Sequence, residues 1–130
     1  MGSYSFGVTV HGEFDDVVER VRATLAEEGF GVLSDIDVAA TMKKKLDKDM
    51  PAYRILGACN PPLASRALDT DPAIGALLPC NVVVRQETEG VIVDFMDPHA
   101  VLGIVDLPGI DELGTEVRNR LERVRDALSA

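Results

Sequence analysis

The chain has 130 residues, 46% hydrophobic and 27% charged, a composition that predicts a single soluble domain over residues 1–130 with a sizeable core. Its 22 acidic and 13 basic residues give a formal net charge of -9, which argues against nucleic acid or an anionic membrane as a partner. No bilayer-spanning segment or signal peptide is recognisable, so a chain with two cysteines is expected to be cytoplasmic and reduced.

The N-terminal half alternates between strand and helix patterns. Residues 5–10 alternate apolar and polar side chains, as in a strand. Apolar residues then recur at helical spacing from Phe14 to Leu25, and Gly29 is placed to end that helix. A second strand is predicted over 30–36.

A second helix is predicted directly after that strand. Asp37 is expected to cap it, and it runs to about Leu46. Its apolar residues are expected to face inward: Val38, Ala39, Met42 and Leu46. The neighbouring Asp35 is assigned to the turn before the cap, and a third strand follows over 53–58.

The stretch Cys59-Asn60-Pro61 follows the third strand at once. Proline has a fixed φ and no N–H, so it fits the first turn of a helix, and it pushes the residue before it away from helical geometry. Asn60 is a favourable N-cap, because its side-chain oxygen can accept a bond from a free backbone N–H. A helix is therefore predicted to begin directly at the end of a strand.

The same cap-then-proline pattern recurs at Asp71-Pro72 and Asp97-Pro98, so each is predicted to begin a short helix. Two short helices after Cys59 can fold back on each other and return the chain to the sheet beside the strand that it left. Cys80 would then lie near Cys59. A single crossover helix would instead separate the two cysteines, and we favour the two-helix arrangement.

The C-terminal part contains the clearest hairpin and the longest helix. Strands are predicted over 81–87 and 91–95, with a turn near Gly90. A helix is predicted from about Asp111 to Leu128, with an apolar stripe on one face. The predicted fold class is therefore α+β: a single sheet of about five strands, helices packed mainly on one face, and a C-terminal helix after the hairpin.

The two cysteines allow two interpretations. A thiol just before a helix N-terminus feels the positive end of the helix dipole, which favours a reactive thiolate at Cys59. Free cysteine is also among the most buried residue types, so both side chains can be simple packing groups, and this is the stronger expectation for Cys80. A disulfide between them is not expected in the cytoplasm.

Four segments together resemble the domain-of-unknown-function family 302: residues 29–33, 55–61, 64–68 and 77–84. The resemblance runs from about Val8 to Leu128. It implies a small α+β fold, commonly a homodimer, with no established activity and no agreed catalytic residues. The residues that match its most recognisable motifs are the candidate binding residues: Cys59, Asn60, Pro61, Pro79, Cys80 and Asn81.

Other chemistry has weak support in the sequence. The available soft or borderline metal donors lack metal-site spacing, so no metal and no cofactor are predicted: His11, Cys59, Cys80, Met96 and His99. A Cys59–His pair as a catalytic dyad has no local signature. The run Lys43 to Lys45 is expected to be a solvated helix face.

Three functions therefore remain open. The first is a homodimeric module that binds an unknown small molecule near Cys59-Asn60-Pro61. The second is a thiol-dependent enzyme or redox protein that uses Cys59 as its catalytic residue. The third is a structural or interaction domain with purely packing cysteines. The apolar segment 100–107 either closes the core beneath the last helix or contributes to a dimer interface.

Overall fold

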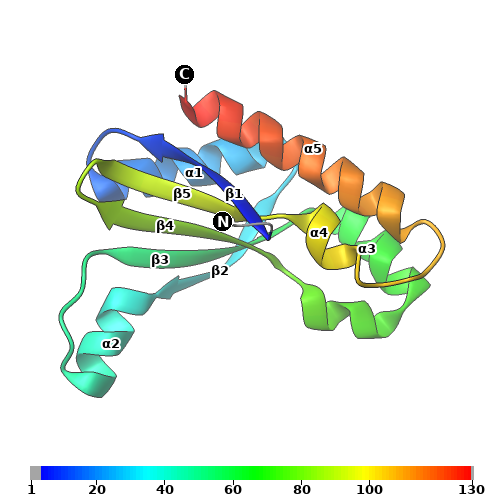
Figure 1. The fold of residues 1–130 in the computed structure, drawn as a ribbon, viewed down its shortest axis with the longest axis horizontal. Helices are drawn as coiled ribbons and strands as arrows, with labels where there is room; N and C mark the ends of the chain where they lie inside the picture. Colours follow the sequence, from blue (N-terminus) through cyan, green and yellow to red (C-terminus); the bar gives the residue numbers. More distant parts are fainter. Residues whose placement is uncertain (1–3, 130) are drawn as a thin grey trace.

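The computed structural model describes residues 4–129 and has one five-stranded sheet with helices (Figure 1). The strands are β1 (Ser5–Val10), β2 (Gly31–Asp37), β3 (Tyr53–Cys59), β4 (Cys80–Glu87) and β5 (Gly90–Met96). The helices are α1 (Phe14–Glu27), α2 (Val38–Leu46), α3 (Pro61–Thr70), the 3-10 helix η1 (Pro72–Leu77), α4 (Pro98–Leu102) and α5 (Ile110–Ser129). The predicted α+β class is confirmed.

The sheet is antiparallel throughout, in the order β1-β5-β4-β3-β2. The β4-β5 hairpin lies in the middle, where both strands are hydrogen-bonded on both sides, and β1 and β2 form the edges. Both edge strands come from the N-terminal third of the chain: β2 pairs with β3, the next strand along the chain, whereas β1 pairs with β5, the last strand.

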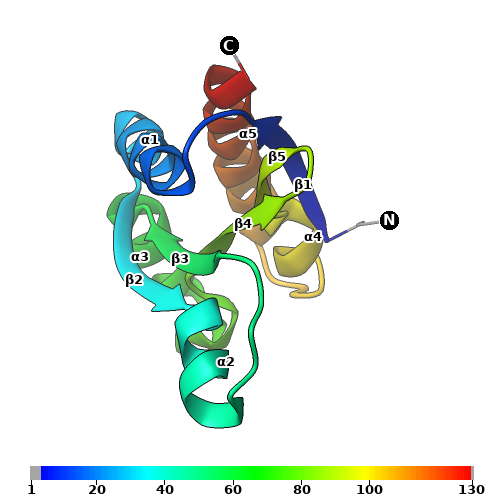
Figure 2. The ribbon, with the colours of Figure 1, turned by 90° about the vertical axis from the view of Figure 1, so that its left-hand side faces the viewer.

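One face of the sheet forms the core. Its central side chains are fully buried: Leu56, Val82, Val84, Val91, Val93 and Phe95. Helices α1 and α5 lie on this side (Figure 2), and both present stripes of buried aliphatic residues at helical spacing. The prediction that helices cover mainly one face is therefore confirmed for these two helices.

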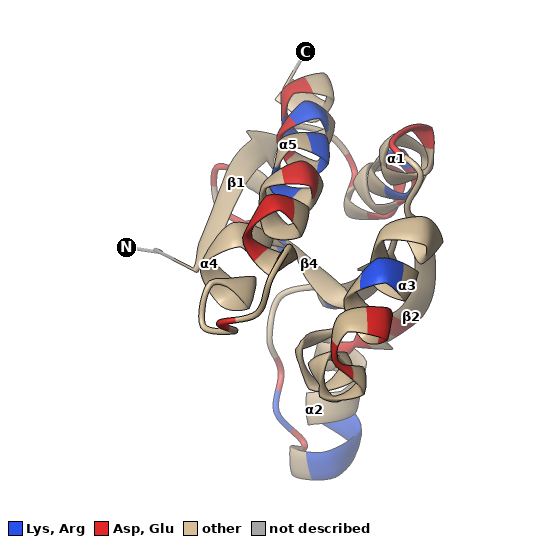
Figure 3. Ribbon diagram, turned by 90° about the vertical axis from the view of Figure 1, so that its right-hand side faces the viewer, with Lys and Arg blue, Asp and Glu red and all other residues tan. Residues whose placement is uncertain are grey.

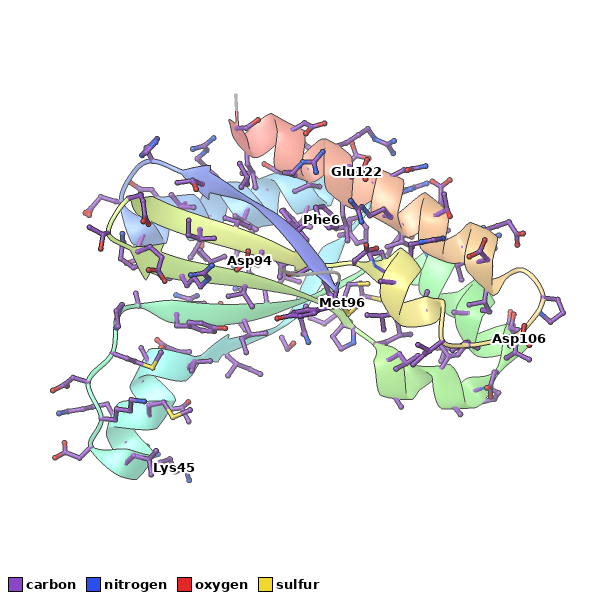
Figure 4. All side chains as sticks on the ribbon, viewed as in Figure 1. Phe6, Lys45, Asp94, Met96, Asp106 and Glu122 are labelled. Atoms are coloured by element: carbon purple, nitrogen blue, oxygen red, sulfur yellow. The ribbon has the colours of Figure 1, made fainter. Side chains whose placement is uncertain are left out.

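The opposite face, here called the open face, carries side chains that alternate with those of the core. Ile36 of β2 pairs with Ile55 of β3, and Ile55 pairs with Val83 of β4, so these three form a row across the sheet. None of the three is fully buried, and Ile36 is 50% exposed. Figure 4 shows Asp94 and Met96 on the side of the sheet turned away from α5, and Phe6 toward α5.

Helix α2 contradicts the prediction that its apolar residues face inward. It has no buried residue, and Leu46 is 67% exposed. Figure 1 shows the reason: α2 projects beyond the β2 edge, away from α1 and α5. Helical periodicity predicts one apolar face, but only the tertiary arrangement decides whether anything covers it.

The two aspartates at the end of β2 have different roles. Asp37 caps α2 as predicted, because its side chain accepts a hydrogen bond of 2.9 Å from Ala40 N. Asp35 lies within the strand instead of in a turn, and it accepts hydrogen bonds from Arg54 of β3 and Arg22 of α1. The neighbouring Arg54 guanidinium, supported by Arg22, lowers the pKa of Asp35. Asp35 thus joins α1 to the edge of the sheet.

The three predicted cap-then-proline starts are confirmed. The side chains of Asn60, Asp71 and Asp97 each accept a backbone N–H of the helix that follows. Helices α3 and η1 fold back, and the chain re-enters the sheet next to β3, where Cys80 pairs with Ala58. This is the two-helix arrangement that brings Cys59 and Cys80 to neighbouring positions.

Candidate functional site

A cavity of about 440 Å³ lies at the end of the sheet where β3 ends and β4 begins. Three walls come from helices, with Leu63, Ala67 and Leu68 on α3, Leu102 on α4, and Leu113 and Val117 on α5. The fourth wall comes from the sheet and its connections, with Phe30, Leu33, Ala58, Cys59, Pro79 and Cys80. The cavity therefore lies where four segments distant in the sequence meet.

The lining of the cavity is apolar. None of the lining residues, all within the described chain, has a charged side chain, and the only polar ones besides the thiols are Ser34 and Asn60. Leu33 and Leu68 are 72% and 40% exposed, so they lie at the mouth, whereas Leu63 and Ala67 are buried. The size lies within the range of about 300–1,000 Å³ that is typical of small-molecule pockets.

Gly57 of β3 allows β2 and the residue before β4 to pack closely against β3 beside the cavity. A Cβ on this residue would lie 2.3 Å from Ser34 Oγ and 2.8 Å from Pro79 Cγ. Only a residue without a side chain allows β2 and the start of β4 to approach β3 this closely. Pro79 and Ser34 both line the cavity, so this contact defines part of its rim.

This chain is similar to a known protein family and to a solved structure over nearly its whole length. The model of the family "Domain of unknown function DUF302" matches residues 6–128. The chain belongs to the DUF302 family. The crystal structure of an uncharacterised conserved DUF302 protein from Bacillus stearothermophilus is similar, with a TM-score of 0.90 and 28% identity, over 98% of this chain and 99% of that chain. No curated protein matches.

Four of the six candidate binding residues of this DUF302 chain line the cavity: Cys59, Asn60, Pro79 and Cys80. The other two do not. Pro61 is exposed at the first turn of α3, and Asn81 is exposed on the open face. Asn81 lies one residue after Cys80 along β4, and consecutive strand residues point to opposite faces.

The two thiols lie in different environments. Cys80 is buried at the start of β4, and this burial, with the nearby Cys59 thiol, raises its pKa to about 11. At neutral pH Cys80 is therefore a neutral, unreactive thiol. Cys59 is partly exposed at the end of β3, and both cysteines are free.

The sequence-based alternatives that involve histidine gain no geometric support. His99 lies at the start of α4 with its Nε2 3.2 Å from Asp111 Oδ1, and it does not line the cavity. Within residues 4–129 no group of three or more His, Cys, Asp or Glu side chains is placed to hold a metal ion. None of the helices in that range is long and apolar enough to span a membrane.

Sequence reasoning did not identify most of the cavity wall. Leu113 and Val117 belong to the apolar stripe of α5, and Leu63 and Ala67 to that of α3, so they look like ordinary core residues. The segment 100–107 divides between the two expectations: Leu102 is buried and Val105 packs against the core, whereas Ile104 and Leu107 are 76% and 37% exposed. No sequence signal separates residues around a cavity from residues in a filled core.

Asn60 has a structural role that can be tested by itself. Its Oδ1 accepts a hydrogen bond of 3.3 Å from Leu63 N, and its Nδ2 donates one of 3.5 Å to the carbonyl of Glu28 at the end of α1. We expect Asn60→Ala to lower the free energy of unfolding by about 1–2 kcal/mol, because the cap and the tether are both lost.

The matched control is Asn81→Ala, in the other Cys-Asn pair. Asn81 is exposed, so its replacement should change the free energy of unfolding by less than about 0.5 kcal/mol. Urea unfolding of both variants measures the difference. Equal losses in the two variants would show that Asn60 does not act through these buried hydrogen bonds.

Proposed function

We propose that this DUF302 chain is a homodimeric binding module that holds a small, uncharged, apolar molecule in the cavity beside Cys59 and Asn60. The observation that carries the proposal is the cavity itself: about 440 Å³, open on one side and bordered by α3, α4, α5 and the β3–β4 end of the sheet. The aliphatic side chains that line this cavity present apolar surface on one side. An apolar ligand would cover that surface.

The lining defines the chemical class of the ligand. Moving a charged group into an apolar site without a partner is strongly unfavourable, and no lining residue is charged. The amide of Asn60 is already engaged with Leu63 N and with Glu28 O, so it offers little to a polar ligand. Aliphatic or aromatic molecules without a formal charge fit these conditions best.

The test uses N-phenyl-1-naphthylamine, a neutral apolar dye whose fluorescence rises in an apolar environment. We expect saturable binding to the wild-type protein. Ala64 lines the cavity on α3 and is only partly buried, so Ala64→Phe should fill the cavity without overpacking the core. Affinity for the dye should fall at least tenfold, equivalent to about 1.4 kcal/mol.

The control is Ser65→Phe, which adds the same ring to the next residue of α3. Ser65 is exposed and does not line the cavity, so dye binding should remain at the wild-type level. Binding that is equally weakened in both variants, or unchanged in both, would mean that the dye does not enter this cavity and would contradict the proposal.

A thiol-dependent function has less support from the geometry. The buried Cys80 thiol has a pKa of about 11 and stays protonated at neutral pH. Cys59 shares the cavity with it, but the lining includes no histidine or carboxylate within the described chain that would accept its proton. The rate at which iodoacetamide alkylates Cys59, measured with and without bound dye, shows whether the ligand lies beside this thiol.

The homodimer in this proposal is supported by exposed apolar residues on the β2 side of the molecule. Leu33 and Ile36 of β2 and Leu46 of α2 are 72%, 50% and 67% exposed. Ile36 also lies in a row with Ile55 and Val83 across the sheet, and a contiguous apolar surface is typical of sites that bind another protein.

A further inference from the structure

We infer that the open face of the sheet, together with α2, is the surface on which a second copy of this chain docks. This inference rests on the homodimer of the proposed function and adds the location of its interface. The open face is defined here by the outward row Ile36, Ile55 and Val83 and its neighbours Tyr53, Ile92 and Met96.

The side chains of the open face are those of an interface. The row Ile36–Ile55–Val83 places three branched aliphatic residues side by side across β2, β3 and β4. Arg85 on the same face donates hydrogen bonds to Asp94 at 2.9 Å and to Glu87 at 2.6 Å, so its guanidinium is paired and the three side chains carry one net negative charge. An apolar centre with its charges paired is the composition of a homodimer interface core.

Charge distribution favours this part of the surface for contact between two copies. Residues 31–60, which build β2, α2 and β3, contain five basic and four acidic residues, so the remainder of the chain carries the whole negative excess. Figure 3 shows the lysines of α2 concentrated at its free end. Two copies that meet through this part of the surface keep the acidic remainder of each chain apart and so avoid much of their mutual repulsion.

The open face and α2 together set the area that is available to a dimer. Five strands at about 4.8 Å spacing and six to eight residues long give a flat footprint of roughly 400–500 Å² for each copy. Two such footprints come to roughly 800–1,000 Å², at the lower limit of a specific interface, so the interface must also include the uncovered apolar side of α2. Without a partner, α2 would project into solvent with Met42 and Leu46 incompletely covered.

Face-to-face packing is favoured over pairing of the β2 edges. The register of β2 against β3 shifts between Val32 and Ser34, and such an irregularity disrupts a straight edge. An apolar sheet face has no such obstacle, and sheets commonly stack at about 10 Å.

The test compares the same substitution on two exposed surfaces. Sedimentation equilibrium at micromolar concentration should give twice the chain mass for the wild-type protein. Ile36→Asp places a charge at the edge of the open face and should raise the dimer dissociation constant at least tenfold. Ile104→Asp, in the exposed loop after α4, should leave the constant unchanged. A circular dichroism spectrum and a urea midpoint for each variant check folding, and Ile36→Ser provides a milder substitution.

Each outcome has a distinct meaning. A wild-type monomer would overturn both this inference and the homodimer of the proposed function, whereas the dye experiment still tests ligand binding by itself. A wild-type dimer that is weakened by Ile104→Asp, or by neither variant, would overturn the location of the interface and leave the homodimer standing. A dimer weakened by Ile36→Asp alone supports the inference.

Discussion

Replacing Asp97 by alanine is expected to lower the free energy of unfolding by about 3 kcal/mol. Asp97 is 9% exposed, and its Oδ1 caps α4 by accepting from His99 N at 2.9 Å and Ala100 N at 3.3 Å. Its Oδ2 accepts a hydrogen bond from Arg118 of α5. The substitution removes the cap, about 0.5–2 kcal/mol, and leaves a partly buried guanidinium without its main partner, about 1–3 kcal/mol.

Arg118 connects Asp97 to the core packing, so removal of the Asp97 carboxylate also affects the core. Its guanidinium carbon lies 4.0 Å from the centre of the Phe6 ring, and its Nε donates to Glu122 at 2.7 Å. Asp97 therefore joins the end of β5, the start of α4 and the middle of α5. Loss of this carboxylate weakens three elements at once.

Asp71→Ala is the matched control, because Asp71 also precedes a proline and caps a short helix. Asp71 caps only η1, through Ala73 N at 3.0 Å, so its loss should cost about 1 kcal/mol. Asp97→Asn, which keeps the cap and removes the charge, should fall between the two. The midpoints of urea unfolding measure all three, and equal losses in Asp97→Ala and Asp71→Ala would contradict the role of the Arg118 pair.

The second large effect is a loss of stability at alkaline pH that depends on Cys80. Burial raises the pKa of this thiol from its ordinary value of 9.0 to about 11. Below pH 9 the thiol is protonated in both the folded and the unfolded protein. Between pH 9 and 11 only the unfolded thiol ionises, so unfolding becomes more favourable by about 2–3 kcal/mol across this window.

Other groups titrate in the same range, so the comparison between variants isolates Cys80. Cys80→Ala is expected to be less stable than the wild-type protein at pH 8, and this difference should shrink by about 2–3 kcal/mol by pH 11. Cys59→Ala should retain the alkaline loss, because Cys80 is still present. Denaturant unfolding at fixed pH values measures the three curves, and parallel curves for the wild-type protein and Cys80→Ala would refute the assignment to Cys80.

Local chemistry at particular residues allowed much of the fold to be predicted. Asn60, Asp71 and Asp97 begin helices because each places a capping oxygen before a proline that lacks an N–H, and this depends only on neighbouring residues. The hairpin around Gly90 follows from two runs of strand-forming residues close together in the sequence. The proximity of the two cysteines could be predicted because two short helices between their strands return the chain to the strand that it left.

The features that only the tertiary structure decided are those that depend on what lies opposite a side chain. The apolar stripe of α2 resembles that of α1 in sequence, yet α1 is covered by the core and α2 projects past the sheet edge. Leu113 and Val117 of α5 have the spacing of core residues, and the meeting of α3, α4 and the sheet end makes them cavity walls. Cys80 and Asn81 are adjacent in sequence, but the alternation of a strand sends only Cys80 to the cavity. Periodicity therefore determined which side of each element is apolar, whereas the packing of distant segments determined whether that side is filled, hollow or left open to a partner.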